Sequence, residues 1–310
     1  MTEGMIERER GLGRMSTRAT SWLAWSLAVL CVVLFLVAVA LHIATLPVRP
    51  PSSWGTGGIS TLLWAILPFL PFPIVGALVA SKRPTNPVGW ICLAVGLVWM
   101  LNMVTGSYMI YGMRVASPGS IPYPAAVGSL AGWLGPMAIL LFGTYLILLF
   151  PDGRLPSSRW RPVAWLCGLV IASDVVVTTL APGPLSDLRG VRNPFGLEGH
   201  PWVASGAIGL LFPLCLLASA SSLVLRYLRS GAEVREQIKW LAFAASVVAL
   251  GVSGAIVQGT FFASDATGSV DPLLGKLLQD AITLSFAGVP VAIGFAVLEY
   301  HLYDINVHPC

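Results

Sequence analysis

The chain has 310 residues, of which 56% are hydrophobic and only 10% are charged, and its mean hydropathy is +0.80. Soluble globular domains carry about 25% charged residues, so this composition excludes an ordinary soluble protein and predicts an all-α integral membrane protein. The net charge of +4 is small and spread over several loops, which argues against a nucleic-acid partner. The five cysteines form no CxxC pair or Cys/His cluster, so neither a disulfide nor a metal or other cofactor is predicted.

The chain begins with a polar segment, residues 1–20, which we expect to be a flexible or interfacial cytoplasmic tail. An apolar run of 25 residues follows, Trp22–Leu46. Because the apolar core of a signal peptide is only about 7–15 residues long, this run is interpreted as an uncleaved membrane helix. It opens a predicted helical bundle that covers residues 21–298.

Seven further apolar runs are close to the length of about 20 residues that crosses a bilayer. They lie at 59–80, 88–111, 125–150, 163–180, 202–227, 238–262 and 277–298. The run 163–180 is the shortest of the seven. With the first run they predict a polytopic bundle of about eight transmembrane helices with both termini cytoplasmic.

The distribution of basic residues supports this count. With the amino terminus inside, thirteen of the 18 Lys and Arg residues fall in predicted cytoplasmic segments and five in outer segments. Cytoplasmic loops carry such an excess of Lys and Arg in membrane proteins. The loss of one span would move every later loop to the other side and would remove this asymmetry.

Local signals mark several helix boundaries. Asn86 followed by Pro87 is a good N-cap pair and predicts the start of the third span. The sequence Pro151-Asp152-Gly153 predicts a tight turn that closes the fourth span.

Proline occurs inside each inward-running span and predicts a bend near mid-depth. The second span has three prolines within PFLPFP, and we expect it to be broken rather than bent. The prolines concerned are Pro68, Pro71, Pro73, Pro136, Pro213 and Pro290.

Asp174 is the one acidic residue deep in an apolar run, at the centre of LVIASDVVVTTL. A charge at mid-bilayer costs about 2.5–3.5 kcal/mol on insertion scales, so such residues usually face the bundle interior. Two interpretations remain open: a carboxyl that senses protons or a ligand, or a protonated aspartic acid that helps to pack the helices. Asn102 and Thr105 in the third span are candidate partners of Asp174, and Gln258 lies nearer the outer face.

The last apolar run ends at Leu298 and turns abruptly amphipathic within the segment 299–310. Tyrosine and charged side chains placed directly after a membrane-length run are typical of the bilayer–water interface. Nothing before Pro309 breaks a helix, so we expect the eighth span to continue to about Asp304 and to carry a movement out of the lipid phase. The candidate signal-exit residues are Glu299, Tyr300, His301, Leu302, Tyr303 and Asp304.

Five stretches of the chain resemble the multi-span membrane regions of actinobacterial-type sensor histidine kinases. They are 86–97 (NPVGWICLAVGL), 150–166 (FPDGRLPSSRWRPVAWL), 193–199 (NPFGLEG), 235–245 (REQIKWLAFAA) and 290–306, in the order that the family shows. The resemblance implies a signal-input domain of a two-component system in the inner membrane of a bacterium. Glu299 and His301 differ from it, since the family usually has arginines there.

In that family the exit stretch continues into a kinase core, whereas this sequence stops four residues after Asn306. Kinase activity is therefore not carried over, and the sequence contains no GxSxG, HExxH or GxxxxGK[ST] motif of an enzyme. The first hypothesis is a truncated input module that acts through a partner, either a separate histidine kinase or a second copy. The alternatives are a small transporter that uses a midplane polar site and a lipid-modifying membrane enzyme.

Overall fold

The computed structural model describes residues 3–48, 67–151, 153–185, 191–199 and 207–229, together with isolated positions between 231 and 294. Within these residues the fold is helical, and the one extended contact is an isolated bridge between Pro184 and Arg192. The α-helices are α1 Glu3–Thr45, α3 Pro71–Lys82, α4 Pro87–Arg114, α5 Pro124–Leu140, α6 Ile147–Leu149, α7 Arg161–Leu180 and α9 Ala207–Arg229. Short 3₁₀ turns cover Leu46–Val48, Leu67–Phe69 and Ser158–Trp160, and Leu141–Leu146 is a π-helical segment, called the π segment below.

Five helical segments among the described residues are long and apolar enough to cross a membrane. They are Arg18–Val48, Pro87–Arg114, Pro124–Leu149, Ser158–Leu180 and Leu211–Arg229. These segments coincide with the first, third, fourth, fifth and sixth predicted spans. In the second predicted span the described helix is α3, and in the seventh and eighth only isolated positions are described, all helical. The count of eight and the location of the termini stay predictions.

The amino-terminal segment, expected to be a flexible or interfacial tail, is helical from Glu3 onward. Helix α1 is continuous from Glu3 to Thr45, so most of the segment 1–20 belongs to the same helix as the first span. At 1.5 Å per residue its 43 residues extend about 65 Å. The hydrocarbon core of a bilayer is about 30 Å thick, so a membrane crossed by α1 leaves much of the helix outside the hydrocarbon.

The predicted boundary signals are confirmed where the structure describes them. The side chain of Asn86 accepts a hydrogen bond from the backbone N–H of Val88 at 3.0 Å, and Pro87 is the first residue of α4. After α6 the chain turns sharply at Gly153, which has a φ of +72° and donates its N–H to the carbonyl of Leu149 at 2.7 Å. A residue with a side chain would be strained at this positive φ.

The prolines affect the helices in two ways. In the described part of the second predicted span, a 3₁₀ turn at Leu67–Phe69, called the break below, precedes α3, which begins at Pro71. In the fourth span, by contrast, α5 continues through Pro136, and the change of helical geometry lies further on, in the π segment. Helix α9 also continues through Pro213, so bends at these two prolines stay predictions.

Close helix packing depends on glycine at several contacts. A methyl group added at Gly89 of α4 would lie 2.6 Å from the backbone nitrogen of Ala80 in α3. One added at Gly76 of α3 would lie 2.7 Å from the backbone nitrogen of Leu93 in α4. Small residues allow helix backbones to approach closely where no hydrophobic force drives association, as between membrane helices.

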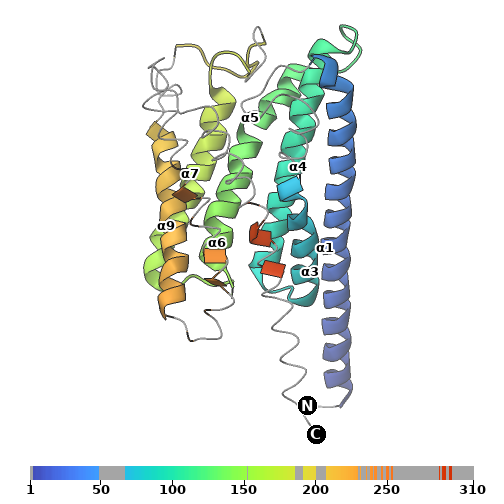
Figure 1. Cartoon of the computed structure of the whole chain (residues 1–310). Helices are drawn as coiled ribbons and strands as arrows, with labels where there is room; N and C mark the ends of the chain where they lie inside the picture. The colour runs from blue at the N-terminus through green and yellow to red at the C-terminus, as the bar shows by residue number, and fades with distance from the viewer. Residues whose placement is uncertain are drawn as a thin grey trace.

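In chain order α1, α3, α4, α5, α7 and α9 run alternately in opposite directions, so that α1 and α4 are parallel (Figure 1). Helix α5 lies between α4 and α7, and α1 and α9 lie at the sides of the view. The end of α3, the start of α4, the end of α6, the start of α7 and the end of α9 all lie at the same end of the bundle. We call it the basic end. The basic residues there are Lys82, Arg83, Arg154, Arg159, Arg161, Arg226, Arg229 and Arg235.

Large apolar side chains remain exposed on the outside of the bundle. Trp22 and Val29 of α1 are 76% and 60% exposed, and Trp165 and Leu169 of α7 are 80% and 64% exposed. Outward-facing apolar surfaces of this kind are compatible with contact with lipid.

Candidate functional site

Asp174 lies on the face of α7 that packs into the bundle. The fully buried residues of this helix are Cys167 and Val170, and Asp174 follows them at the i+3, i+7 spacing of one helical face. The oxygen Oδ2 of Asp174 is buried and has no hydrogen-bond partner among the described residues. Thr178, one turn further on, lies within hydrogen-bonding reach of the same carboxyl group. Asp174 is thus half-buried on the side of α7 that carries Cys167 and Val170.

The other predicted members of this polar site lie elsewhere. The amide Nδ2 of Asn102 donates a hydrogen bond to the carbonyl of Ala131 in α5 at 2.7 Å. Thr105 donates within its own helix, to the carbonyls of Leu101 at 2.9 Å and Asn102 at 3.1 Å. The expectation that these two residues partner Asp174 is therefore not met, because α5 lies between α4 and α7.

Asn102 thus joins α4 to α5, and Thr105 bonds within α4. Gln258 lies outside the described residues. Among the residues that the structure describes, no group of three or more His, Cys, Asp and Glu side chains could hold a metal ion.

A different constellation occupies the core around the break at Leu67–Phe69. The ring of Phe69, in the 3₁₀ turn, stacks on Trp99 of α4 with centroids 3.8 Å apart and planes inclined by 11°. Phe72, at the start of α3, meets Phe142 of the π segment edge-on at 5.6 Å. The break and the π segment are the two non-α elements in the middle of described spans, and aromatic contacts join them.

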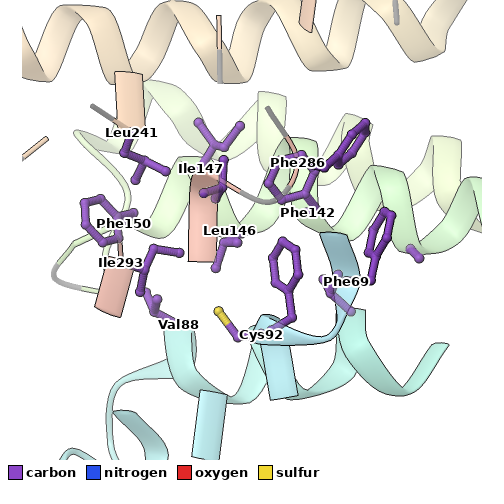
Figure 2. Close-up of a cluster of buried hydrophobic side chains, with 14 of the residues drawn as sticks. Phe69, Val88, Cys92, Phe142, Leu146, Ile147, Phe150, Leu241, Phe286 and Ile293 are labelled. Atoms are coloured by element: carbon purple, nitrogen blue, oxygen red, sulfur yellow. The ribbon is translucent and has the colours of Figure 1, made fainter. Parts of the chain in front are cut away.

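Phe286 of the eighth predicted span completes this aromatic cluster. Its ring centroid lies 5.4 Å from that of Phe69 and 5.0 Å from that of Phe142 (Figure 2). Aromatic pairs at such separations contribute about 0.5–1.5 kcal/mol each beyond the burial of their area. The last predicted span therefore touches both irregular elements at once.

Further residues of the eighth predicted span are buried on the same side of the span as Phe286. Val289 and Ile293 are fully buried in the same apolar cluster as Phe286, whereas Gly288 is exposed. A methyl group added at Gly294 would lie 3.5 Å from Val75 of α3. Because Phe286 meets Phe69 and Gly294 meets Val75, the span runs parallel to α3 and toward the basic end.

At the basic end a guanidinium group joins two helices. Nη1 of Arg226, in the last turn of α9, donates to the carbonyl of Phe150 at 2.5 Å, and Nη2 donates to the carbonyl of Leu148 at 2.9 Å. Nη2 also donates to the carbonyl of Arg154 in the following turn. The last carbonyls of a helix have no partner within the helix, and a cation beside them also interacts favourably with the helix dipole.

The same turn contacts the start of α4. Nδ2 of Asn86 donates to the carbonyl of Pro151 at 3.1 Å. A methyl group added at Gly153 would lie 2.5 Å from Cδ of Pro87 and 2.8 Å from Oδ1 of Asn86. The stretches 86–97 and 150–166, which were singled out separately in the sequence, thus meet at the basic end.

The core links the basic end to the aromatic cluster. Phe150, beside Arg226, belongs to the same buried cluster as Val88, Leu241 and Ile293, and this cluster extends to Phe142 and Phe69 (Figure 2). Its members come from the first, second, third, fourth, sixth, seventh and eighth predicted spans. We call the aromatic cluster, the Arg226 contacts and the core between them the coupling core.

Sequence reasoning missed the coupling core. The signal that could have indicated Arg226 is its position within the last turn of an apolar helix, where a long cation can reach the orphan carbonyls that precede Pro151. The signal-exit residues Glu299, Tyr300, His301, Leu302, Tyr303 and Asp304 lie outside the described residues. Comparison of the chain with protein-family models, curated proteins and solved structures finds no match.

Proposed function

We propose that this chain is a membrane-embedded signal-input module of two-component type that acts on a partner. The observation that carries the proposal is the central place of the eighth predicted span. Phe286 contacts both the break at Phe69 and the π segment at Phe142, and the span runs on toward the basic end.

The mechanism follows from how such a core responds to a disturbance. Protein interiors are close-packed, so a local change moves neighbouring elements between discrete arrangements and does not fade gradually. A 3₁₀ turn within a span and a π-helical segment are the kinds of irregularity at which helices rearrange. A stimulus that alters the second or fourth span is therefore transmitted through Phe286 to the eighth span.

The output is a small rotation or shift of the eighth span in the membrane. The exit segment 299–310 carries it to the cytoplasmic side, where Leu298, Leu302 and Ile305 are spaced for one apolar stripe. A helical partner presented by a separate histidine kinase or by a second copy fits such a stripe.

The experiment fuses the full chain after Ile305, in helical register, to the dimerisation helix and catalytic core of a sensor kinase. We expect the fusion to autophosphorylate in membranes and the unfused chain to show no phosphorylation with ATP. Insertion of three or four residues at the junction rotates the helix and should change the activity. Insertion of seven residues, about two turns of 3.6 residues, is the matched control and should leave it nearly unchanged.

Two results would contradict the proposal. One is autophosphorylation of the unfused chain. The other is a fusion whose activity is the same for insertions of three, four and seven residues, which would mean that the eighth span transmits no rotation.

A further inference from the structure

Two buried thiols lie against each other between α7 and α9. Cys167 is 0% exposed and Cys215 is 1% exposed, and both belong to one apolar cluster. The thiols of Cys167 and Cys215 lie within hydrogen-bonding reach of each other. Cys31 and Cys92 are equally buried, but no contact between thiols is described for either of them.

Packing against the π segment fixes the parts of α7 and α9 that carry the two thiols. Gly168, beside Cys167, is so close to this segment that an added methyl group would lie 2.7 Å from the hydroxyl oxygen of Tyr145. A methyl group added at Gly143 would lie 2.2 Å from Cδ2 of Leu216, the neighbour of Cys215. The hydroxyl of Tyr145 also donates to the carbonyl of Ala164 in α7 at 2.8 Å.

The surroundings of Cys167 and Cys215 favour an uncharged disulfide over a metal ion bound by two thiolates. The described side-chain hydroxyls that interact with the Cys167 thiol are those of Thr144, Tyr145 and Ser219, which carry no positive charge. A metal ion bound by both thiolates would need further ligands or would leave a net negative charge without a cation beside it, which is costly in an apolar core. A disulfide carries no charge and requires no further ligand.

We propose that Cys167 and Cys215 form a reversible disulfide that ties α7 to α9 when a hydroperoxide oxidises the pair. The sulfur of Cys215 attacks one peroxide oxygen, the O–O bond breaks, and the thiol proton leaves with the departing oxygen as water or alcohol. The sulfur of Cys167 then attacks the resulting sulfenic acid, and the S–O bond breaks with release of water. Two thiols and one hydroperoxide thus give one disulfide, one water and one further water or alcohol.

Disulfide formation changes the helix contact. An S–S bond is about 2.05 Å long, shorter than a hydrogen bond between two thiols, so oxidation draws α7 and α9 together beside the π segment. Cys215, Ser219, Ser222 and Arg226 follow one face of α9 at spacings of four, three and four residues. The disulfide therefore lies on the same face of α9 as Arg226. Only an effect of oxidation on signalling through the Arg226 contacts rests on the proposed function.

The test counts free thiols in the full-length protein in lipid vesicles. A Cys310→Ser background removes the terminal thiol and leaves four of the five cysteines. After treatment with hydrogen peroxide or with an apolar alkyl hydroperoxide, the protein is denatured in SDS, labelled with a maleimide and weighed by mass spectrometry. We expect the labelled thiols to fall from four to two and dithiothreitol to restore four. A faster loss with the apolar reagent identifies the lipid phase as the source of the oxidant, and a faster loss with hydrogen peroxide identifies the aqueous phase.

Matched variants decide whether the pair is specific. Cys167→Ser should retain its three remaining thiols under both reagents, and Cys215→Ser repeats the test if the first variant does not fold. Cys31→Ser should still lose two thiols. Retention of all four thiols in the background protein would overturn the inference, as would equal losses in Cys167→Ser or losses that dithiothreitol does not reverse. Because the assay needs no kinase fusion, its failure leaves the proposed function standing.

Discussion

Replacement of Arg226 by leucine should destabilise the bundle much more than the same change at Arg229. Arg226 donates to the carbonyls of Leu148 and Phe150, two residues that are 0% and 1% exposed. Hydrogen bonds to a charged group contribute about 1.5–3 kcal/mol each, and buried carbonyls left without a donor add a desolvation cost. Since the two bonds share one guanidinium group and are not additive, we expect Arg226→Leu to lower the free energy of unfolding by about 2–4 kcal/mol.

The matched control lies one turn further along the same helix. Arg229 is exposed, so Arg229→Leu should change the free energy of unfolding by no more than about 0.5 kcal/mol. Arg226→Lys should fall between the two, because an ammonium group donates from one point and cannot reproduce the fork of a guanidinium. The assay titrates SDS into micelles of a mild detergent and follows helix loss by circular dichroism. Equal losses for Arg226→Leu and Arg229→Leu would refute the assigned role of the Arg226 contacts.

Three further predictions concern topology, polar packing and glycine contacts. Reporter fusions after Arg154 should be cytoplasmic and fusions near Arg189 external; a cytoplasmic signal at Arg189 would mean that a span is miscounted. Asn102→Leu should cost about 0.6–1.7 kcal/mol, the range for hydrogen bonds between membrane helices, and an unchanged SDS midpoint would contradict this. Gly89→Ala should be strongly destabilising, because its methyl group would lie 2.6 Å from a backbone nitrogen, whereas Gly106→Ala on the same helix meets its nearest neighbour at 3.8 Å. Similar SDS midpoints for the two glycine variants would show that α3 and α4 separate at little cost.

The sequence predicted those features that depend on local chemistry. The cap at Asn86 and the turn at Gly153 follow from the conformations that asparagine and glycine favour, and both are confirmed. The start of α3 at Pro71 follows from the preference of proline for the first turn of a helix. The membrane-length helices follow from the lengths of the apolar runs. Each of these signals lies within a few residues of the feature that it predicts.

Features that depend on contacts between distant segments were not predicted. The π segment LFGTYL contains no proline, and its environment is set by Tyr145 bonding to Ala164 and by Leu216 packing at Gly143. The Arg226 contacts join residues 76 and 78 positions apart in the chain. The pairing of Asn102 with Asp174 was inferred from similar depth in the membrane, but depth does not tell which helix lies between them.

The measurement that tests the account most directly compares two changes on the eighth span in the kinase fusion. Phe286 faces the break and the π segment, whereas Gly288, two residues on, is exposed and has open space around it. Autophosphorylation in membranes is measured for Phe286→Ala and Gly288→Ala, with Phe286→Leu as a variant that keeps much of the buried volume. We predict that Phe286→Ala changes the activity several-fold, that Phe286→Leu changes it less, and that Gly288→Ala leaves it unchanged. Equal activity of all three variants, with Phe286→Ala folded by circular dichroism, would contradict the claim that the core drives the eighth span.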